Sequence, residues 1–315
     1  MDLQSPPQSI CMLCGTTAKF GFVHKLRDDE TRNVYQCDTC GHIQILPLPL
    51  REDDELRYQR NEQYKQIHSL VSEFQNEEKL MSKYCAFVKN SLKYFINYVN
   101  KNQKILDIGT GYGWAVELLR EDGYEIDGAE ISDLKRQMLK QRSGIELFDW
   151  NLLDGVPNVI KACYDVISMF HVLEHISEPI IFLKRAAALL KTTGAIYIEV
   201  PNHDDYMKTA LPEYNAFSYT RQHLSYFTHK TLFSLLVSAG FKEIKFFGLQ
   251  NYSFENSLWW MREKRPFLDY HQINVPKPLQ WLNKIYKERV ESELKSCYIV
   301  CIGYKRNEDS TSEVC

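Results

Sequence analysis

Lys104-Ile-Leu-Asp-Ile-Gly-Thr-Gly-Tyr-Gly113 is the stretch of this chain that decides its fold. Its apolar beginning predicts a buried strand over 104–108, and apolar residues at helical spacing follow over 114–122. A strand, a glycine turn and a helix in this order are typical of the nucleotide-binding half of a doubly wound α/β sheet. Glycines suit a turn where a ligand lies against the backbone, because a Cβ would block the approach. The glycines of this turn are Gly109, Gly111 and Gly113.

The spacing of the turn excludes two common nucleotide sites. A dinucleotide fingerprint would need a third glycine where this chain has Trp114, and a P-loop would need a Gly-Lys-Ser/Thr ending. The next apolar run, over 124–130, ends in Glu130, whose carboxylate can accept hydrogen bonds from two ribose hydroxyls. A glycine turn is shared by many α/β folds, so Glu130 and the later segments must identify the cofactor.

Composition limits the class of protein. The 315 residues are 44% hydrophobic, which is ample for one sizeable core with a small appendage. A net charge of −3 provides no basic field that would recruit nucleic acid. The sequence has no apolar run of the roughly 18–20 residues that span a bilayer, and its N-terminus lacks the basic start and apolar core of a signal peptide. We therefore expect a cytoplasmic protein with no membrane and no nucleic-acid partner.

Four of the nine cysteines have metal-ligand spacing. Two Cys-x-x-Cys pairs, each followed by a glycine and separated by 22 residues, comprise Cys11, Cys14, Cys37 and Cys40. Thiolates two residues apart can share one tetrahedral Zn²⁺, and four sulfurs fill its coordination sphere. We predict a structural zinc site that folds a ribbon over residues 1–45, since so short a segment has almost no core of its own. Four unrelated thiols or a redox pair are the alternatives.

The rest of the chain divides by pattern. A proline-containing linker and a charged, tyrosine-bearing segment occupy 46–76, and a doubly wound domain occupies 77–306. Within that domain 249–295 is expected to be an insertion on the acceptor side, Thr228 is expected to cap a helix, and 307–315 is expected to be a disordered tail. The other strands and helices are predicted at 104–108, 114–122, 124–130, 133–142, 145–149, 164–169, 178–191, 195–200, 241–248 and 297–304.

Five ordered segments give the domain a family resemblance. They are the glycine stretch ILDIGTGYG, the acidic end of GAEIS, the block YDVISMFHVLEHISEP, YIEVPN, and RQHLSYFT followed by AGF. Together they resemble class I S-adenosylmethionine (SAM)-dependent methyltransferases over about 104–304, especially the bacterial branch that acts on sugars and small molecules. The cysteine pairs add to the likeness, because a zinc-binding front domain occurs in the similar sugar C-methyltransferases. The resemblance implies a doubly wound, seven-stranded Rossmann-like sheet and SAM as the cofactor.

The resemblance also implies which residues hold SAM. Asp107 would hold the methionyl amino group, and the glycine turn would carry the methionine portion against its backbone. Glu130 would take the ribose, and the adenine would lie against Asp149 and Trp150 after the third strand. Phe170, after the fourth strand, completes the predicted cofactor site. For the acids, a solvated carboxylate at a strand end is the alternative.

A cluster of histidines follows the fourth strand, at the mouth of the predicted site. His171 and His175 are four residues apart and would share a face of a helical turn, and Glu174 adjoins His175. By the resemblance His175 is the general base that removes the acceptor's proton, with Glu174 orienting it. His223, in a later segment that faces the same cleft, is a second candidate base. The alternatives are a divalent metal, which has been linked to this cluster in a ubiquinone-type O-methyltransferase branch, and simple capping of helix and strand ends.

The acceptor is expected to be a small molecule. By the resemblance, two tyrosines would form a lid over the site, and tyrosines half-packed on a surface are the alternative. Two more residues come from the segment around His223, and one comes from Gln250-Asn-Tyr-Ser-Phe-Glu-Asn-Ser-Leu-Trp-Trp260, which resembles methyltransferases of surface-polysaccharide pathways. Aromatic side chains suit sugars, so the prediction is a nucleotide-linked or polysaccharide-precursor sugar. The residues predicted to bind it are Tyr58, Tyr64, Arg221, Tyr226 and Asn256.

Two other functions compete with this one. Zinc ribbons also precede some RNA methyltransferases, but the predicted ribbon is not basic. The second is a SAM-binding or zinc-binding interaction module that has lost catalysis, and the intact glycine turn and the Glu174-His175 pair argue against it. The sequence leaves open whether oxygen, nitrogen or carbon is methylated, and whether the protein is a monomer or a homodimer.

Overall fold

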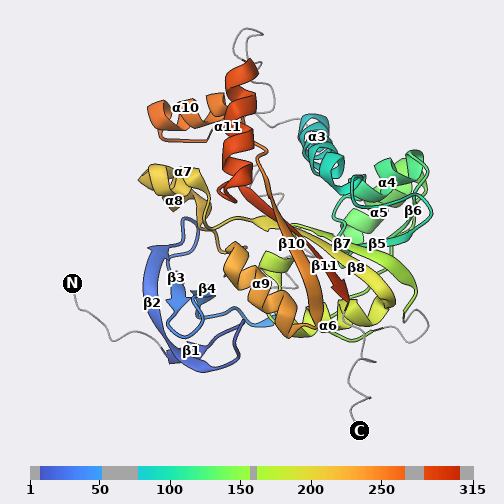
Figure 1. Cartoon of the computed structure of the whole chain (residues 1–315), viewed down its shortest axis with the longest axis horizontal. Coiled ribbons are helices and arrows are strands. Elements are labelled where there is room, and N and C mark those ends of the chain that lie inside the picture. Colours follow the sequence, from blue (N-terminus) through green and yellow to red (C-terminus); the bar gives the residue numbers. More distant parts are fainter. Residues whose placement is uncertain (1–7, 52–76, 157–161, 267–279, 306–315) are drawn as a thin grey trace.

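The computed structural model describes residues 8–51, 77–156, 162–266 and 280–305. Two β-sheets organise them, a large mixed sheet in the middle of the molecule and a small antiparallel sheet at one side (Figure 1). Tyr58, Tyr64 and the predicted tail 307–315 lie outside the described residues. Among the residues that are described, no helix combines the length and the apolar character needed to cross a membrane.

The large sheet has six strands in the order β10-β11-β8-β7-β5-β6. Their bounds are β5 Lys104–Ile108, β6 Glu125–Ala129, β7 Tyr164–Phe170, β8 Leu190–Pro201, β10 Phe241–Leu249 and β11 Tyr298–Lys305. β6, β5, β7 and β8 are parallel, whereas β11 is antiparallel to both β8 and β10. The strand order reverses between β5 and β7, and an open α/β sheet binds its ligand beyond the carboxyl ends of the strands at such a point.

The predicted seventh strand is not a strand in the structure. The segment 145–149 forms one isolated parallel bridge, Ala129↔Phe148. Two backbone hydrogen bonds make it, from Phe148 N to Gly128 O at 2.8 Å and from Glu130 N to Phe148 O at 2.9 Å. The Phe148 ring then stacks on Trp150 with 3.7 Å between ring centroids. Alternate residues of a fully extended strand lie about 6.6 Å apart. The two stacked rings are closer together than that spacing, which fits a backbone that leaves the extended conformation after the single bridge.

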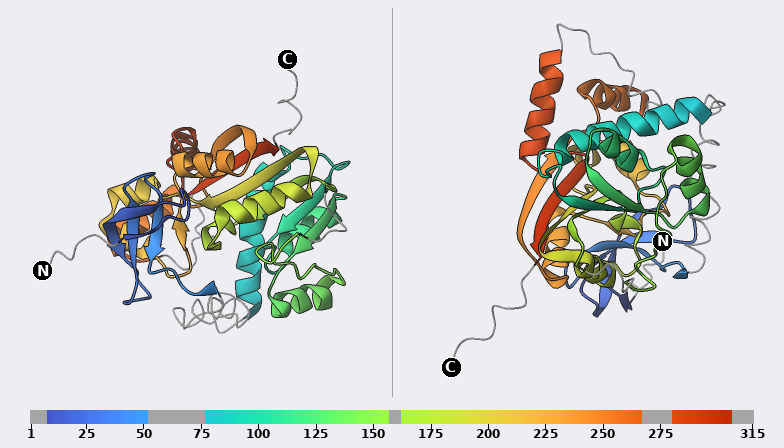
Figure 2. Two further views of the ribbon diagram at one scale, coloured as in Figure 1. Left: turned by 90° about the horizontal axis from the view of Figure 1, so that it is seen from below. Right: turned by 90° about the vertical axis from the view of Figure 1, so that its right-hand side faces the viewer.

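Helices cover both faces of the large sheet (Figure 2). Phe95 of α3 and Val116 of α4 lie in the buried cluster on one face, and Phe182 of α6 and Leu235 of α9 lie in the cluster on the other. Thr228 caps α9 as predicted, through a capping box with Thr231. The helices are α3 Glu77–Phe95, α4 Trp114–Glu121, α5 Asp133–Ser143, α6 Pro179–Leu189, α7 Tyr206–Ala210, α8 Pro212–Ser218, α9 His229–Ser238, α10 Phe254–Glu263 and α11 Gln280–Ser292.

The small sheet joins two distant parts of the chain. Its first four strands are β1 Gln8–Ile10, β2 Thr17–Lys25, β3 Asn33–Cys37 and β4 Ile43–Leu46, and its fifth is β9, Ser225–Tyr226. β9 pairs antiparallel with β4, at Ile43↔Tyr226 and Gln44↔Ser225. The sequence predicts a zinc-binding ribbon over 1–45, and in the structure a segment of the doubly wound domain completes the sheet in this region. We call residues 8–46 the N-terminal module.

Candidate active site and cysteine cluster

The glycine turn after β5 combines one open position with two crowded ones. Gly109, Gly111 and Gly113 all have left-handed backbone angles, with φ of 70°, 60° and 79°. A Cβ on Gly109 would stand 2.6 Å from Val172 Cγ2, and one on Gly113 would overlap Leu139. A Cβ on Gly111 would meet no atom within 4 Å. The space for a ligand therefore lies at Gly111, while the other two glycines allow close packing of the segments on either side.

Glu130 holds the shape of this turn. Its side chain is buried, and its two oxygens accept hydrogen bonds from Gly111 N at 2.8 Å and Ser132 N at 2.9 Å. A carboxylate has about four acceptor positions, so two are left for the ribose hydroxyls that the sequence assigns to it. The open position at Gly111 and this carboxylate together fit the ribose and methionine portions of SAM.

Asp107 lies at the end of β5, next to the turn. Its side chain is 2% exposed, and Ser168 Oγ donates a hydrogen bond to it at 2.7 Å. Burial raises the pKa of Asp107 to about 7, although the bond from Ser168 acts in the opposite direction. The carboxyl is thus poised to ionise when a cation, such as an amino group, is placed beside it.

We expect the binding of S-adenosylhomocysteine (SAH) to tighten by about fivefold between pH 6 and pH 7. The free protein binds a proton at Asp107 below its raised pKa, and this proton must leave before the carboxylate can hold the amino group. Isothermal titration calorimetry across this range measures the effect. Asp107→Asn should bind more weakly and lose the pH dependence, while Asp133→Asn, an exposed acid in α5, should behave as the wild type. An unchanged slope in Asp107→Asn would contradict this role.

Asp149 and Trp150, predicted to read the adenine, lie apart from Phe170, the other residue predicted to bind the cofactor. Trp150 and Phe148 stack face to face, with an interplanar angle of 5°, and form a flat aromatic surface beyond β6. Asp149, which lies between these two residues in the sequence, is exposed. Phe170 packs its ring on Phe95 and Tyr197, with centroids at 5.6 and 5.5 Å, on the face covered by α3. Phe170 therefore contributes to the core there, which its place after an apolar strand does not reveal.

His171 lies between two buried carboxylates. Its Nε2 is 2.9 Å from Glu199 Oε1 and its Nδ1 is 3.4 Å from Glu174 Oε1. Burial alone would lower the pKa of His171, but the two acids outweigh it and raise the pKa to about 10. The backbone of His171 has φ of 56°, an uncommon value for a residue with a side chain, as is found where the surroundings fix a functional group. The two carboxylates therefore favour the protonated form of His171 at neutral pH, and a protonated ring has no lone pair with which to accept a proton.

Glu199 was missed by the sequence analysis. It lies in β8, within the apolar YIEVPN segment, and its side chain is 0% exposed. Ser91 Oγ of α3 donates to the same oxygen, Oε1, at 2.9 Å. A charged residue in a buried strand is the signal that could have found it, because such a residue needs a partner of opposite charge.

His175 is oriented by the segment after α8. Its Nδ1 lies 2.7 Å from the backbone oxygen of Gln222, and its Nε2 lies 3.8 Å from Glu174 Oε1. Since a carbonyl oxygen only accepts, Nδ1 carries the proton and Nε2 carries the lone pair in the neutral ring. The ring of His223 is 5.1 Å away, and burial together with His175 lowers the pKa of His223 to about 3. Of the three predicted histidines, His175 has the geometry of a general base.

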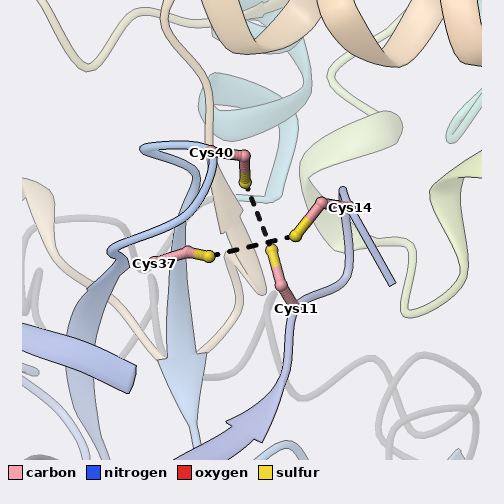
Figure 3. A group of neighbouring side chains, drawn as sticks. All are labelled: Cys11, Cys14, Cys37 and Cys40. Carbon is pink, nitrogen blue, oxygen red and sulfur yellow. Dashed lines mark hydrogen bonds between the residues drawn. The ribbon is translucent and has the colours of Figure 1, made fainter. Parts of the chain in front are cut away.

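Among the residues that the structure describes, two groups of side chains bring metal-binding donors close together. The four predicted cysteine sulfurs converge at one end of the N-terminal module and lie within 4.8 Å of one another (Figure 3). Cys11 Sγ is 3.5 Å from Cys40 Sγ, and Cys14 Sγ is 4.0 Å from Cys37 Sγ. Sulfurs around one tetrahedral Zn²⁺ are about 3.8 Å apart, from Zn–S distances of about 2.3 Å. The second group is Glu174, His175 and His223.

Three of the predicted acceptor residues lie in the described part of the chain, namely Arg221, Tyr226 and Asn256. Tyr226 is buried in β9, where its hydroxyl accepts from Thr220 N at 3.0 Å and donates to Thr220 O at 2.9 Å. Asn256 is buried in the first turn of α10, whose cap is Ser253. Arg221 directly precedes Gln222 and His223, and its backbone N–H donates to Asp28. Arg221 adjoins the histidine cluster along the chain, and the ring of Tyr226 lies 5.9 Å from that of His223.

Comparison with known proteins agrees with this geometry. A family model described as a methyltransferase domain matches residues 56–245, which is more than half of the chain. The ubiquinone biosynthesis O-methyltransferase of Idiomarina loihiensis is 26% identical over 106 residues, covering 32% of this chain and 44% of that protein. The protein of the same name from Coxiella burnetii is 26% identical over 117 residues, covering 36% and 50%. The chain thus spans about half the length of the curated relatives it matches.

Solved structures show the same fold. A SAM-dependent methyltransferase from Archaeoglobus fulgidus has a TM-score of 0.51 at 18% identity, with 73% of this chain and 100% of that chain covered. A SAM-dependent methyltransferase from Thermotoga maritima, described as a possible histamine N-methyltransferase, also has a TM-score of 0.51, at 16% identity, with 76% and 100% covered. Together with the family match, the parallel sheet and the glycine turn, these likenesses establish that the chain belongs to the class I SAM-dependent methyltransferase family.

Proposed function

We propose that this protein transfers the methyl group of SAM to a hydroxyl oxygen of a small polar acceptor, with His175 as the general base. The observation that carries the proposal is the hydrogen bond of 2.7 Å between His175 Nδ1 and Gln222 O. Because Nδ1 donates its proton to this carbonyl, Nε2 is the ring nitrogen that would take a proton from the substrate. A hydroxyl must lose its proton as it is methylated, so a base in this position suits oxygen as the methylated atom.

The place of His175 relative to the cofactor site supports this role. His175 ends a single 3-10 turn, Leu173–His175, that begins three residues after the end of β7 at Phe170. The residue before that turn, Val172, packs so closely on the glycine turn that Gly109 has no room for a side chain. Bound SAM would supply a methyl carbon that its sulfonium already activates, and this chain would align the acceptor and remove its proton. Asp107, Gly111 and Glu130 would hold the cofactor on the other side of this contact.

The histidines around Glu174 support an electrostatic role for its carboxylate. Burial alone would raise the pKa of Glu174, but His171 together with His175 and His223 lowers it to about 2. Glu174 is therefore ionised at neutral pH, 3.8 Å from His175 Nε2. A carboxylate at this distance stabilises the imidazolium that forms when His175 takes a proton. We propose Glu174 as the residue that provides this stabilisation.

The first candidate acceptor is a nucleotide-linked or polysaccharide-precursor sugar. Around His171, the rings of Phe87 and Tyr298 lie at 5.2 and 4.6 Å, and the Tyr298 hydroxyl is 3.2 Å from that of Tyr252. Rings combined with hydroxyls suit the apolar faces and polar edges of a sugar. The second candidate is a phenol, which the same rings could stack upon. The names of the relatives, ubiquinone biosynthesis O-methyltransferases, support oxygen as the methylated atom.

Release of SAH in the presence of different acceptors tests the proposal. The panel contains UDP-, GDP- and dTDP-sugars, catechol and other simple phenols, free amines and tRNA. Turnover on a sugar with a methyl ether in the product, detected by mass spectrometry, is the expected result. Turnover on phenols alone would select the second candidate. Methylation of tRNA or of amines alone would overturn the proposal, and so would SAH binding with no turnover on any acceptor.

A divalent cation at Glu174, His175 and His223 is the competing interpretation of the same cluster, because two imidazoles and a carboxylate are suitable donors. Such a cation would occupy donor atoms that our proposal leaves to the acceptor. Dialysis against EDTA, with the zinc content checked before and after, separates the two. Activity that survives dialysis supports a histidine base, whereas activity that is lost and then restored by Mg²⁺ or Mn²⁺ supports a metal.

We also propose that the four cysteines hold one structural zinc ion. Elemental analysis should find about one zinc per chain in the wild type and in Cys85→Ser, a change in α3 outside the cluster. Cys37→Ser removes one of four thiolates and should lower the zinc content severalfold and the melting temperature by several degrees, because metal binding supplies folding free energy to a module with a small core. Full zinc occupancy in Cys37→Ser would contradict a four-cysteine site.

A further inference from the structure

The backbone after α8 is held by the N-terminal module at two places. The first place is β9, whose residues pair with β4 at Ile43↔Tyr226 and Gln44↔Ser225. Ile45 N extends this contact with a hydrogen bond to Leu224 O at 3.1 Å. Backbone ladders of this kind fix the register of a segment, since a slip by one residue would turn every side chain to the opposite face.

The second place is a turn after β2. The carboxylate of Asp28 accepts a hydrogen bond from Arg221 N at 2.8 Å and another from Thr220 Oγ1 at 2.7 Å. The preceding residue, Arg27, donates its backbone N–H to Tyr219 O at 3.0 Å. A carboxylate that accepts from a backbone N–H is among the stronger anchors of a loop, because the acceptor is charged.

The two residues between these places are Gln222 and His223, and they adjoin the proposed base. Gln222 O takes the hydrogen bond of His175 Nδ1, and the ring of His223 lies against His175. The next residue, Leu224, donates its backbone N–H to Glu174 O at 2.8 Å. The N-terminal module thus binds the backbone on both sides of residues 222–223, the segment that orients His175.

The cysteine cluster lies next to the β4–β9 pairing, the first of the two places. β3 ends at Cys37, the turn of Cys40 follows, and β4 begins at Ile43. Cys37 N donates to His42 O at 2.8 Å, and His42, which is buried, places Nε2 3.1 Å from Ser225 Oγ of β9. A metal ion that closes this turn would therefore also fix the strand to which β9 is paired.

We infer that the N-terminal module is a positioning element for methyl transfer, in which Asp28 and the β4–β9 pairing hold the Gln222 carbonyl that orients His175. Asp28 and His42 are positioning residues, since they act through residues 220–226. The inference rests on the proposed role of His175. The module would raise turnover by fixing one hydrogen bond of the base, and it would leave the cofactor site at Asp107, Gly111 and Glu130 unaffected.

Asp28→Ala tests the inference without changing a cysteine. Loss of both hydrogen bonds to Asp28 should raise the hydrogen-exchange rate of backbone amides in 220–227 by about tenfold. The same change should lower kcat on the acceptor found by the panel about tenfold, because small misplacements of a catalytic group are costly. The Kd for SAH should stay within about twofold. Asp28→Asn keeps a side-chain carbonyl to accept from Arg221 N, so it should restore most of the protection and of the turnover.

Asp38→Ala provides the matched control, because Asp38 lies in the same module, is exposed, and accepts a bond from the neighbouring Thr39 side chain. It should leave exchange and turnover unchanged. Unchanged exchange of 220–227 in Asp28→Ala would overturn the inference, and so would faster exchange with normal kcat. If no acceptor turns over, the rate at which diethyl pyrocarbonate modifies His175 replaces kcat. A rate equal to that of the wild type then overturns the positioning role, separately from the fate of the proposed reaction.

Discussion

We expect His175→Ala to lower kcat by about 10²–10⁴-fold, the range that a positioned general base contributes. The ring has its Nδ1 proton committed to Gln222 O, so Nε2 is the atom that takes the proton of the acceptor. Initial rates of SAH release on the acceptor found by the panel measure the loss. Binding of SAH should be unchanged, since none of the residues proposed to hold the cofactor relies on His175.

Two further variants make the result for His175 specific. His229→Ala removes a histidine that opens α9, outside the cluster of Glu174, His175 and His223, and should leave kcat within about twofold. His223→Ala should reduce kcat less than His175→Ala, because a histidine whose pKa is lowered to about 3 is a weak base. A larger loss in His223→Ala, or full activity in His175→Ala, would show that the proton is removed elsewhere or needs no base.

The second large effect concerns stability. We expect Glu199→Ala to lower the free energy of unfolding by about 3–5 kcal/mol at pH 6, because it removes one partner of a buried ion pair. His171 would keep its charge beside Glu174 alone, and Ser91 would lose its acceptor. Urea unfolding followed by circular dichroism measures the loss. Glu125→Ala, which removes an exposed glutamate from β6, should change stability by no more than about 0.5 kcal/mol.

The loss in Glu199→Ala should depend on pH with a defined sign. The pKa of His171 is raised from 6.5 to about 10 in the folded state, so folding favours the protonated ring. The stabilisation is therefore complete below pH 6.5 and is lost as the pH rises through 10. The difference between wild type and Glu199→Ala should shrink between pH 6 and pH 10. A difference of the same size at both ends of this range would mean that packing, and not charge, accounts for the effect.

The acids around His171 show which part of the site could be predicted from the sequence and which part could not. The motif identifies Glu174 and both histidines of that block, and the structure places His171 and His175 at 3.4 and 3.8 Å from the Glu174 carboxylate. It does not assign the protons, because the charge of His171 depends on Glu199, which lies 28 residues further along the chain. Without that second carboxylate, the spacing of His171 and His175 makes the two rings equivalent. The two buried carboxylates favour the protonated form of His171, whereas the contact of His175 Nδ1 with Gln222 O sets the orientation of the His175 ring.

The sequence by itself determined what short spacings encode. A strand that ends in three glycines, Glu130 at the end of the next strand and two Cys-x-x-Cys pairs each involve neighbours along the chain, so their chemistry can be read without knowing the packing. Only the tertiary structure decided which glycine faces open space, that β9 completes the N-terminal sheet, and that the Gln222 carbonyl orients His175 across 47 residues. These contacts form between elements that meet after folding, and the hydrophobic patterns that bring the elements together carry no record of which polar atoms will then lie within hydrogen-bonding distance.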